Sequence, residues 1–192
     1  MDINRVAGCN FTLGVMSDDF VDVILGALKE VDQTKVWSQT DYVSTVVRGR
    51  YSHVFDVVKA IYSHAAHTGK HVTMSGTFGI GCNKDNDAEP YLNEDDVRLN
   101  EARSYEFDID AGCKFAIYAV GIEKYGEIIA SEVKLAEEEV EVTPDHFTTR
   151  LDGKVNNIFL AMENAFKRVQ EKAPHTKITF TISSNSPSNQ SK

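Results

Sequence analysis

The sequence predicts an α+β fold, a tandem repeat of two βαββαβ units with antiparallel sheets. The first observation behind this is an internal repeat that spans most of the chain. The second is that, within each copy, the spacing of apolar residues switches between the period of a strand and that of a helix. The hydrophobic fraction of 42% and the charged fraction of 26% are ordinary for a globular protein.

The repeat appears when the sequence is aligned with itself. Residues 7–11 (AGCNF) match residues 111–115 (AGCKF) at four of five positions, a spacing of 104 (111 minus 7). A period this long indicates a duplicated domain, because solenoid repeats run to about 20 to 50 residues. The same spacing, without a gap, pairs further identical residues: Asp41 with Asp145, Thr45 with Thr149, Gly49 with Gly153, Phe55 with Phe159, His71 with His175 and Thr77 with Thr181.

The first half of each unit is predicted as a strand, a helix and a hairpin. In the first copy, apolar residues alternate over residues 5–16, which predicts a strand. Ser17 is expected to cap a helix whose apolar positions recur from Phe20 to Val31. Strands near residues 36–39 and over residues 42–48 should follow, joined by a short polar connection around Thr40 and Asp41.

The second half of each unit is predicted as a helix and a final strand, here over residues 54–65 and 72–80. This βαββαβ order is that of the ferredoxin-like unit, an antiparallel sheet with two helices on one face. The second copy repeats the order, with a strand at residues 111–120, a helix around residues 124–137, a hairpin through Pro144 and Asp145, a helix at residues 157–171 and a strand at residues 177–182.

These elements predict four segments in the chain. We expect the first ferredoxin-like repeat at residues 1–83, an acidic linker at 84–104, the second repeat at 105–183 and a flexible tail at 184–192. Each unit leaves one sheet face bare, and two exposed and partly apolar faces would form large adhesive patches. We therefore predict that the two sheets pack against each other, within the chain or across a dimer.

Charge and composition exclude several classes of function. The net charge of −9 disfavours binding to nucleic acid. The chain shows neither an apolar run of roughly 18 to 20 residues, which a membrane span needs, nor the core of a signal peptide, so the cytoplasm is expected. Cys9, Cys82 and Cys113 form no C-x-x-C pair and are expected to be reduced core thiols. No catalytic signature is present, so we expect neither an enzyme nor a cofactor.

A polar row in the second hairpin strand of each copy is the candidate site. Thr45 and Val47 are expected to share a face with Asp41, and that face should lie against the helices. Polar groups there need partners. One interpretation is structural, with threonine hydroxyls bonded to the backbone and aspartates shaping the turn. The other is a small-molecule pocket between sheet and helices, floored by Thr45 or Thr149 and walled by Leu13 or Ile117.

Three histidines suggest a metal site that the repeat argues against. His64 and His67 lie on one helical face, with His71 nearby. The second copy has Arg168 and Glu171 at the first two positions, and neither is an imidazole. We therefore expect no metal.

The run at residues 36–49 (VWSQTDYVSTVVRG) resembles the bacterial YkoF family of thiamine/hydroxymethylpyrimidine-binding proteins. The resemblance continues through residues 16–20, 53–56, 59–62, 76–78, 80–82 and 184–187. It implies two ferredoxin-like repeats, an intimate homodimer, and thiamine or its pyrimidine precursor bound in each repeat. It also implies a role in salvage or uptake of the pyrimidine half of the vitamin.

Carried onto this chain, the resemblance implies ligand contacts at Leu13 and Thr45 and at their counterparts. Asp41 is expected to bring a carboxylate near the ligand's amino group or thiazolium cation, because an anionic chain suits thiamine better than its pyrophosphate. The alternatives are a scaffold or regulatory protein, or an enzyme of thiamine metabolism. The expected ligand-binding residues are Leu13, Asp41, Ser44 and Thr45 in the first repeat, and Ile117, Asp145 and Thr149 in the second.

Overall fold

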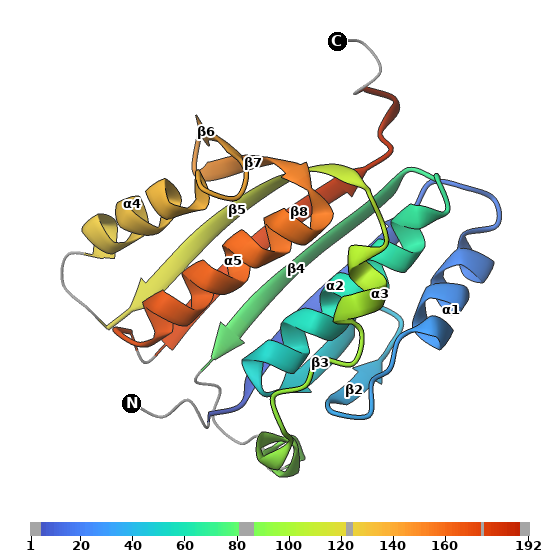
Figure 1. Ribbon diagram of the computed structural model, residues 1–192, viewed down its shortest axis with the longest axis horizontal. Coiled ribbons are helices and arrows are strands. Elements are labelled where there is room, and N and C mark those ends of the chain that lie inside the picture. Colours follow the sequence, from blue (N-terminus) through green and yellow to red (C-terminus); the bar gives the residue numbers. More distant parts are fainter. Residues whose placement is uncertain (1–4, 81–86, 122–124, 174, 189–192) are drawn as a thin grey trace.

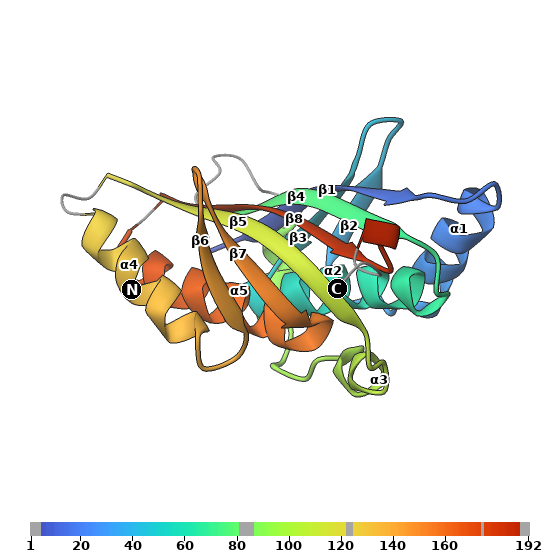
Figure 2. The same ribbon diagram turned by 90° about the horizontal axis from the view of Figure 1, so that it is seen from above.

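The computed structural model describes residues 5–80, 87–121, 125–173 and 175–188. Its strands join into one eight-stranded antiparallel sheet, and the long helices cover one face of that sheet (Figures 1 and 2). The first repeat consists of β1 (Ala7–Val15), α1 (Phe20–Glu30), β2 (Trp37–Thr40), β3 (Thr45–Gly49), α2 (Tyr51–His67) and β4 (Val72–Ile80). The second consists of β5 (Asp110–Val120), α4 (Tyr125–Ala136), β6 (Glu141–Asp145), β7 (Thr148–Lys154), α5 (Val155–Gln170) and β8 (His175–Ser184).

The strand order confirms two ferredoxin-like units. It reads β2-β3-β1-β4-β8-β5-β7-β6, so the first four positions and the last four show the same order in mirror sequence. In each unit the first and last strands are neighbours and the hairpin lies outside the first strand. Both hairpins therefore end at the outer edges of the sheet.

The two units are joined edge to edge through β4 and β8. These strands pair antiparallel over eight register positions, from Val72 with Ser184 to Gly79 with Lys177. The prediction that the sheets stack face to face within the chain is therefore wrong. A single unit on its own would expose an edge strand whose backbone N–H and C=O groups lack partners. Pairing β4 with β8 satisfies both edges in one continuous ladder.

The open face of the sheet is polar at its centre. Asn10, Thr12, Ser75 and Thr181 are exposed there, and the hydroxyls of Ser75 and Thr181 lie 2.8 Å apart. The expectation of a partly apolar open face is wrong for this central region. Threonine forms strands readily. Polar side chains of this kind remain solvated, so a bare face is compatible with water.

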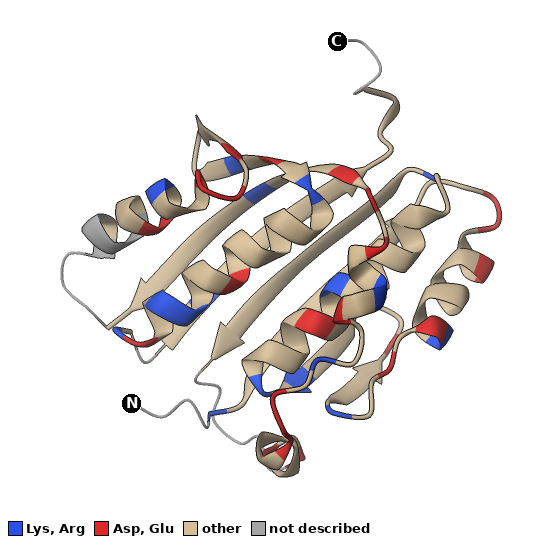
Figure 3. Cartoon of the chain, in the orientation of Figure 1, with Lys and Arg blue, Asp and Glu red and all other residues tan. Residues whose placement is uncertain are grey.

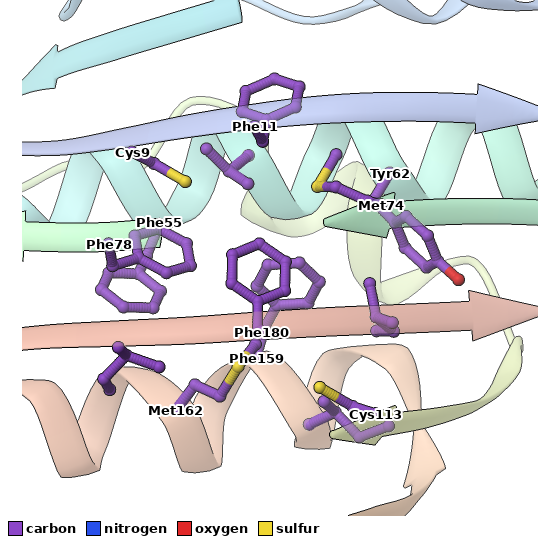
Figure 4. Close-up of a cluster of buried hydrophobic side chains, with 14 of the residues drawn as sticks. Cys9, Phe11, Phe55, Tyr62, Met74, Phe78, Cys113, Phe159, Met162 and Phe180 are labelled. Carbon is purple, nitrogen blue, oxygen red and sulfur yellow. The ribbon is translucent and has the colours of Figure 1, made fainter. Parts of the chain in front are cut away.

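The core lies between the sheet and helices α2 and α5 (Figure 4). Phe55 of α2 stacks on Phe78 of β4 with ring centroids 3.9 Å apart, and Phe78 stacks on Phe180 of β8. The hydroxyl of Tyr62 donates to Ser184 Oγ at 2.8 Å, which joins the two repeats inside the core. One hydrophobic core therefore serves both units.

The cysteines that the structure describes are part of this core. Cys9 and Cys113 are buried free thiols, as predicted. Burial raises the pKa of both well above the usual range, so both stay protonated. Cys82 lies outside the described residues.

The segment between the repeats packs across the helical layer. It carries the 3-10 helix η1 (Glu89–Asn93) and the short helix α3 (Glu101–Tyr105). Its acidic residues pair with basic residues of the first repeat, Asp95 with Lys35 and Asp96 with Arg50. Figure 3 shows acidic positions, in red, along this segment. The described part of this segment, from residue 87 onward, is therefore packed against the helical face.

Helix α1 is much less buried than α2 or α5. Of its residues only Ala27 is buried, while Phe20 and Leu25 are about half exposed. The predicted cap at Ser17 is wrong, because α1 begins after Asp19 and no side chain caps it. Ser17 Oγ instead donates to the Asp19 carboxylate, which also pairs with Lys70.

Candidate functional site

In both repeats the first strand extends beyond the end of its pairing with the hairpin. The last register pair of β5 with β7 is Phe115 with Thr149, although β5 continues to Val120. Likewise β1 pairs with β3 as far as Phe11 with Thr45 and continues to Val15. Along a free edge, every second residue directs its N–H and C=O away from the sheet. Each repeat therefore has a notch whose backbone groups have no strand partner among the described residues.

In the second repeat this notch is a cleft with a volume of about 510 Å³. One wall is β5 from Phe115 to Val120, another is the β6–β7 hairpin, and Val133 of α4 closes a third side. The lining is mainly apolar, with few polar groups. Such clefts, with apolar walls and a few convergent polar atoms, are typical of small-molecule sites.

Three residues expected in the second site line this cleft, namely Ile117, Asp145 and Thr149. Thr148, which the alternation of side chains assigns to the other face, lines it as well. Its Oγ1 is buried and has no hydrogen-bond partner among the described residues. The available signal for Thr148 was its alignment with Ser44, one of the residues expected in the first site.

The first repeat has the same arrangement with different contacts. Leu13 is partly buried against the core, and Thr45 stands at the start of β3. The Oγ1 atoms of Thr45 and Thr40 lie 3.0 Å apart, while Thr12 Oγ1 donates to the backbone oxygen of Val43 at 3.1 Å. Thr45 therefore bonds to a side chain rather than to the backbone.

Asp41 lies in the hairpin turn rather than in the strand. Its Oδ1 accepts the backbone N–H of Val43 at 2.7 Å and of Ser44 at 2.9 Å. The Ser44 and Val43 bonds hold the pKa of Asp41 below its usual value, so the carboxylate stays charged. The strand predicted at residues 42–48 is too long, because Asp41 shapes a turn that lasts until Thr45 begins β3.

Asp145 likewise does not share a strand with Thr149. It ends β6, and the turn is formed by His146 and Phe147, not by Pro144 and Asp145 as predicted. Its carboxylate accepts the N–H of His146 at 2.8 Å and pairs with Lys114. Lys114, and then the His146 bond, lower the pKa of Asp145. An ionised carboxylate, paired with the Lys114 ammonium, therefore lies at the rim of the cleft.

The tip of this hairpin presents Phe147 to the cleft. The residue has a φ of 63° and is 99% exposed. Both features are unusual for phenylalanine, and positive φ is rare for a bulky side chain. The sequence carries no signal for this conformation.

The three histidines considered for metal binding contact other side chains of the protein rather than one another. The rings of His64 and His67 contact Phe107, with centroid separations of 5.0 Å and 4.3 Å. His71 Nε2 lies 3.1 Å from Ser183 Oγ. Across the described ranges, no three metal-ligating side chains converge.

In the part of the chain that the structure describes, no helix has the length and apolar character to cross a membrane.

A family model described as the YkoF-related family matches the chain twice, at residues 6–85 and 110–189. A protein of Bacillus subtilis (strain 168) described as "Putative HMP/thiamine-binding protein YkoF" is 40% identical over 186 residues, which cover 96% of this chain and 93% of that protein. The two family matches each contain one βαββαβ unit and its notch. The chain belongs to the YkoF-related family.

Proposed function

We propose that this protein binds thiamine or its hydroxymethylpyrimidine precursor, one ligand in the notch of each repeat, as part of salvage or uptake of the vitamin. The observation that carries the proposal is the cleft of about 510 Å³ at Ile117, Thr148 and Thr149. The description of the Bacillus subtilis relative as HMP/thiamine-binding supports the same ligand class.

The chemistry of the cleft suits an aminopyrimidine. Such a ring is flat and apolar on its faces, while its edge carries an amino donor and ring-nitrogen acceptors. The free edge of β5 offers both N–H and C=O groups. The Thr148 hydroxyl both donates and accepts, and its buried oxygen has no partner within the described residues. A ligand edge that bonds this hydroxyl removes the cost of leaving it unpaired.

Binding without chemical conversion is the form of the proposal that fits the lining. Among the described lining residues, Asp145 and Tyr118 are the titratable side chains. Asp145 is already engaged by Lys114 and by the His146 N–H, so it is a poor general base. The fixed anion instead favours a ligand with an amino group or a cationic ring.

We also propose that the protein forms a homodimer through the open face of the sheet. All long helices lie on the other face (Figure 2), so one face of eight strands is available. Its central hydroxyls, such as those of Ser75 and Thr181, suit a hydrated interface in which water bridges polar groups. Sedimentation velocity should show a dimer that Ser75→Arg weakens. A wild-type monomer at every concentration would contradict the dimer.

Isothermal titration calorimetry of the full chain with hydroxymethylpyrimidine and with thiamine tests the ligand proposal. We expect two ligands per chain and a rise in melting temperature with ligand concentration, since a ligand of the folded state stabilises it by mass action. After prolonged incubation, NMR of the ligand should show it unchanged. Absence of binding to both compounds refutes the proposal, and appearance of a product indicates an enzyme instead.

A further inference from the structure

The hairpin that bounds the second cleft holds an aromatic side chain in an unfavourable backbone conformation. Asp145 pairs with Thr148, which leaves His146 and Phe147 as a two-residue turn. Only the second of these has a positive φ, 63°, which is the sign pattern of a type II turn. That position favours glycine or asparagine, because a Cβ there crowds the backbone.

The phenylalanine ring gains little from the folded chain in return. Its side chain is 99% exposed, so it contributes almost no buried surface to the core. It nevertheless lines the cleft, next to Thr148 with its buried and unpartnered hydroxyl. A strained turn with an exposed ring and an adjacent unsatisfied polar atom indicates a group that finds its partner only when ligand is bound.

We infer that Phe147 is the ring-stacking residue of the second cleft: its ring covers one face of a flat heteroaromatic ligand while Thr148 and the free edge of β5 bond the ligand's edge. This rests on the proposed function and adds to it the element that selects aromatic rings. Heteroaromatic rings stack on phenylalanine with useful affinity because each has an extended π-face. The apolar wall at Ile117 lies in the same cleft.

The two sites are consequently unequal. The residue that corresponds to Phe147 in the first repeat is Val43, which has no ring and is 62% exposed. The first hairpin is also built differently, as a longer turn tied to the Asp41 carboxylate. The second cleft therefore depends on ring stacking, and the first does not acquire it from the equivalent position.

The test compares single substitutions in the full chain by calorimetry with hydroxymethylpyrimidine and thiamine. Phe147→Leu keeps apolar bulk and removes the π-face, and should weaken one of the two sites about tenfold, which is about 1.4 kcal/mol. Phe147→Trp keeps a π-face and should leave the affinity of that site unchanged. Val43→Ala is the matched control at the other hairpin and should leave the Phe147-dependent site unchanged.

Two readouts separate stacking from a structural role. NMR on protein with labelled phenylalanine should show a nuclear Overhauser effect between the pyrimidine protons and one ring, and this signal should vanish in Phe147→Leu. Phe147→Gly should raise the melting temperature of the free protein, because glycine adopts a positive φ without strain. The same substitution should weaken ligand binding, because it removes the ring.

The outcomes distinguish this inference from the proposed function. If wild-type protein binds either compound but Phe147→Leu binds it with wild-type affinity at every site, the stacking role is refuted and the proposed function stands. If wild-type protein binds neither compound, the proposed function fails and the stacking role fails with it.

Discussion

Thr45, Thr148 and Thr149 carry the polar chemistry of the candidate sites, and each has a different neighbour. Thr45 Oγ1 lies beside Thr40 Oγ1, whereas Thr148 Oγ1 is buried with no partner in the described chain. Thr149 pairs with Phe115 at the end of the β5–β7 ladder. A hydroxyl is therefore present at the closed end of each notch, and its removal is the simplest test of ligand contact.

We expect Thr45→Val to weaken ligand at the first site by about 1 to 3 kcal/mol, because the ligand's polar edge loses its partner. The fold should persist, since valine has the shape of threonine and forms strands well. Calorimetry measures the loss at that site. Thr181→Val on the open face is the matched control and should bind normally, and unchanged affinity in Thr45→Val removes Thr45 from the site.

Asp145 should make the second site prefer thiamine to thiamine pyrophosphate. The Lys114 ion pair lowers its pKa, so the carboxylate remains ionised at neutral pH and would repel a pyrophosphate near the cleft. Competition titrations should show that the second site binds thiamine more tightly than thiamine pyrophosphate. Asp145→Asn should reduce this difference in affinity. Tighter binding of the pyrophosphate by wild-type protein would mean that another group, such as Lys114, dominates.

At the scale of elements, the segment between the repeats is held by a buried ion pair. Arg98 Nη1 contacts Glu163 Oε2 of α5 at 2.8 Å, and a second nitrogen contacts the other carboxylate oxygen. Asn100 is tied to Asp56 of α2 through its backbone N–H at 3.0 Å. The segment therefore bridges a helix of each repeat, although its composition suggested an acidic linker.

Breaking this ion pair should destabilise the protein. Glu163 is buried, and burial raises its pKa although the Arg98 contacts oppose that shift. Glu163→Ala removes the buried partner of the partly buried Arg98, so we expect the free energy of unfolding in urea to fall by about 3 kcal/mol. Glu101→Ala removes the more exposed partner of Arg98, at 3.6 Å, and should cost under about 1 kcal/mol. Equal losses would show that burial of the pair is unimportant.

The hairpins show where element prediction from sequence fails. The apolar pattern located both strands of each hairpin and correctly expected Asp41 in the first turn, but it began the second strand of that hairpin three residues too early and placed the second turn two residues too early. In the first repeat the turn is set by the Asp41 carboxylate, which accepts two backbone N–H groups. In the second it is set by the conformation of Phe147. Neither interaction produces a hydrophobic period.

At the scale of the whole molecule, the two repeats meet at a pseudo-twofold axis where equivalent residues face each other. Gly76 is the counterpart of Phe180 at the spacing of 104 (180 minus 76), and these two residues are also opposite each other in the β4–β8 ladder. Two phenylalanines there would collide and two glycines would leave a void. The copies have diverged so that one small and one large residue fill the space together.

Charge has diverged at the same axis. Lys59 of α2 is the counterpart of Glu163 of α5, since 163 minus 59 is 104, and both side chains are buried. The attraction of Glu163 opposes the lowering of the Lys59 pKa by burial. Two identical charges at these places would repel, so opposite charges favour the pairing of one repeat with the other.

Gly76→Ala tests this packing. An added Cβ would lie 2.8 Å from the backbone oxygen of Asn10 and from Phe11 Cβ, so strands in the middle of the sheet must shift. We expect the free energy of unfolding, measured with urea, to fall by about 1 to 3 kcal/mol. Gly79→Ala, where the nearest atom is 3.6 Å away, is the control on the same strand and should be nearly neutral. A neutral Gly76→Ala would contradict the close approach at the axis.

The duplication, the βαββαβ order of each unit and the burial of Cys9 and Cys113 follow from the amino-acid sequence alone, because repeats and local hydrophobic periods are properties of one chain segment at a time. It also indicated Ile117, Asp145 and Thr149, which the structure brings together in one cleft. The edge-to-edge joining of the sheets, the free edge of β5 and the exposure of Phe147 were decided by tertiary structure. The first two depend on which backbone edges find a partner, and the third depends on the conformation of a two-residue turn. Contacts between segments about a hundred residues apart leave no periodic pattern in the sequence.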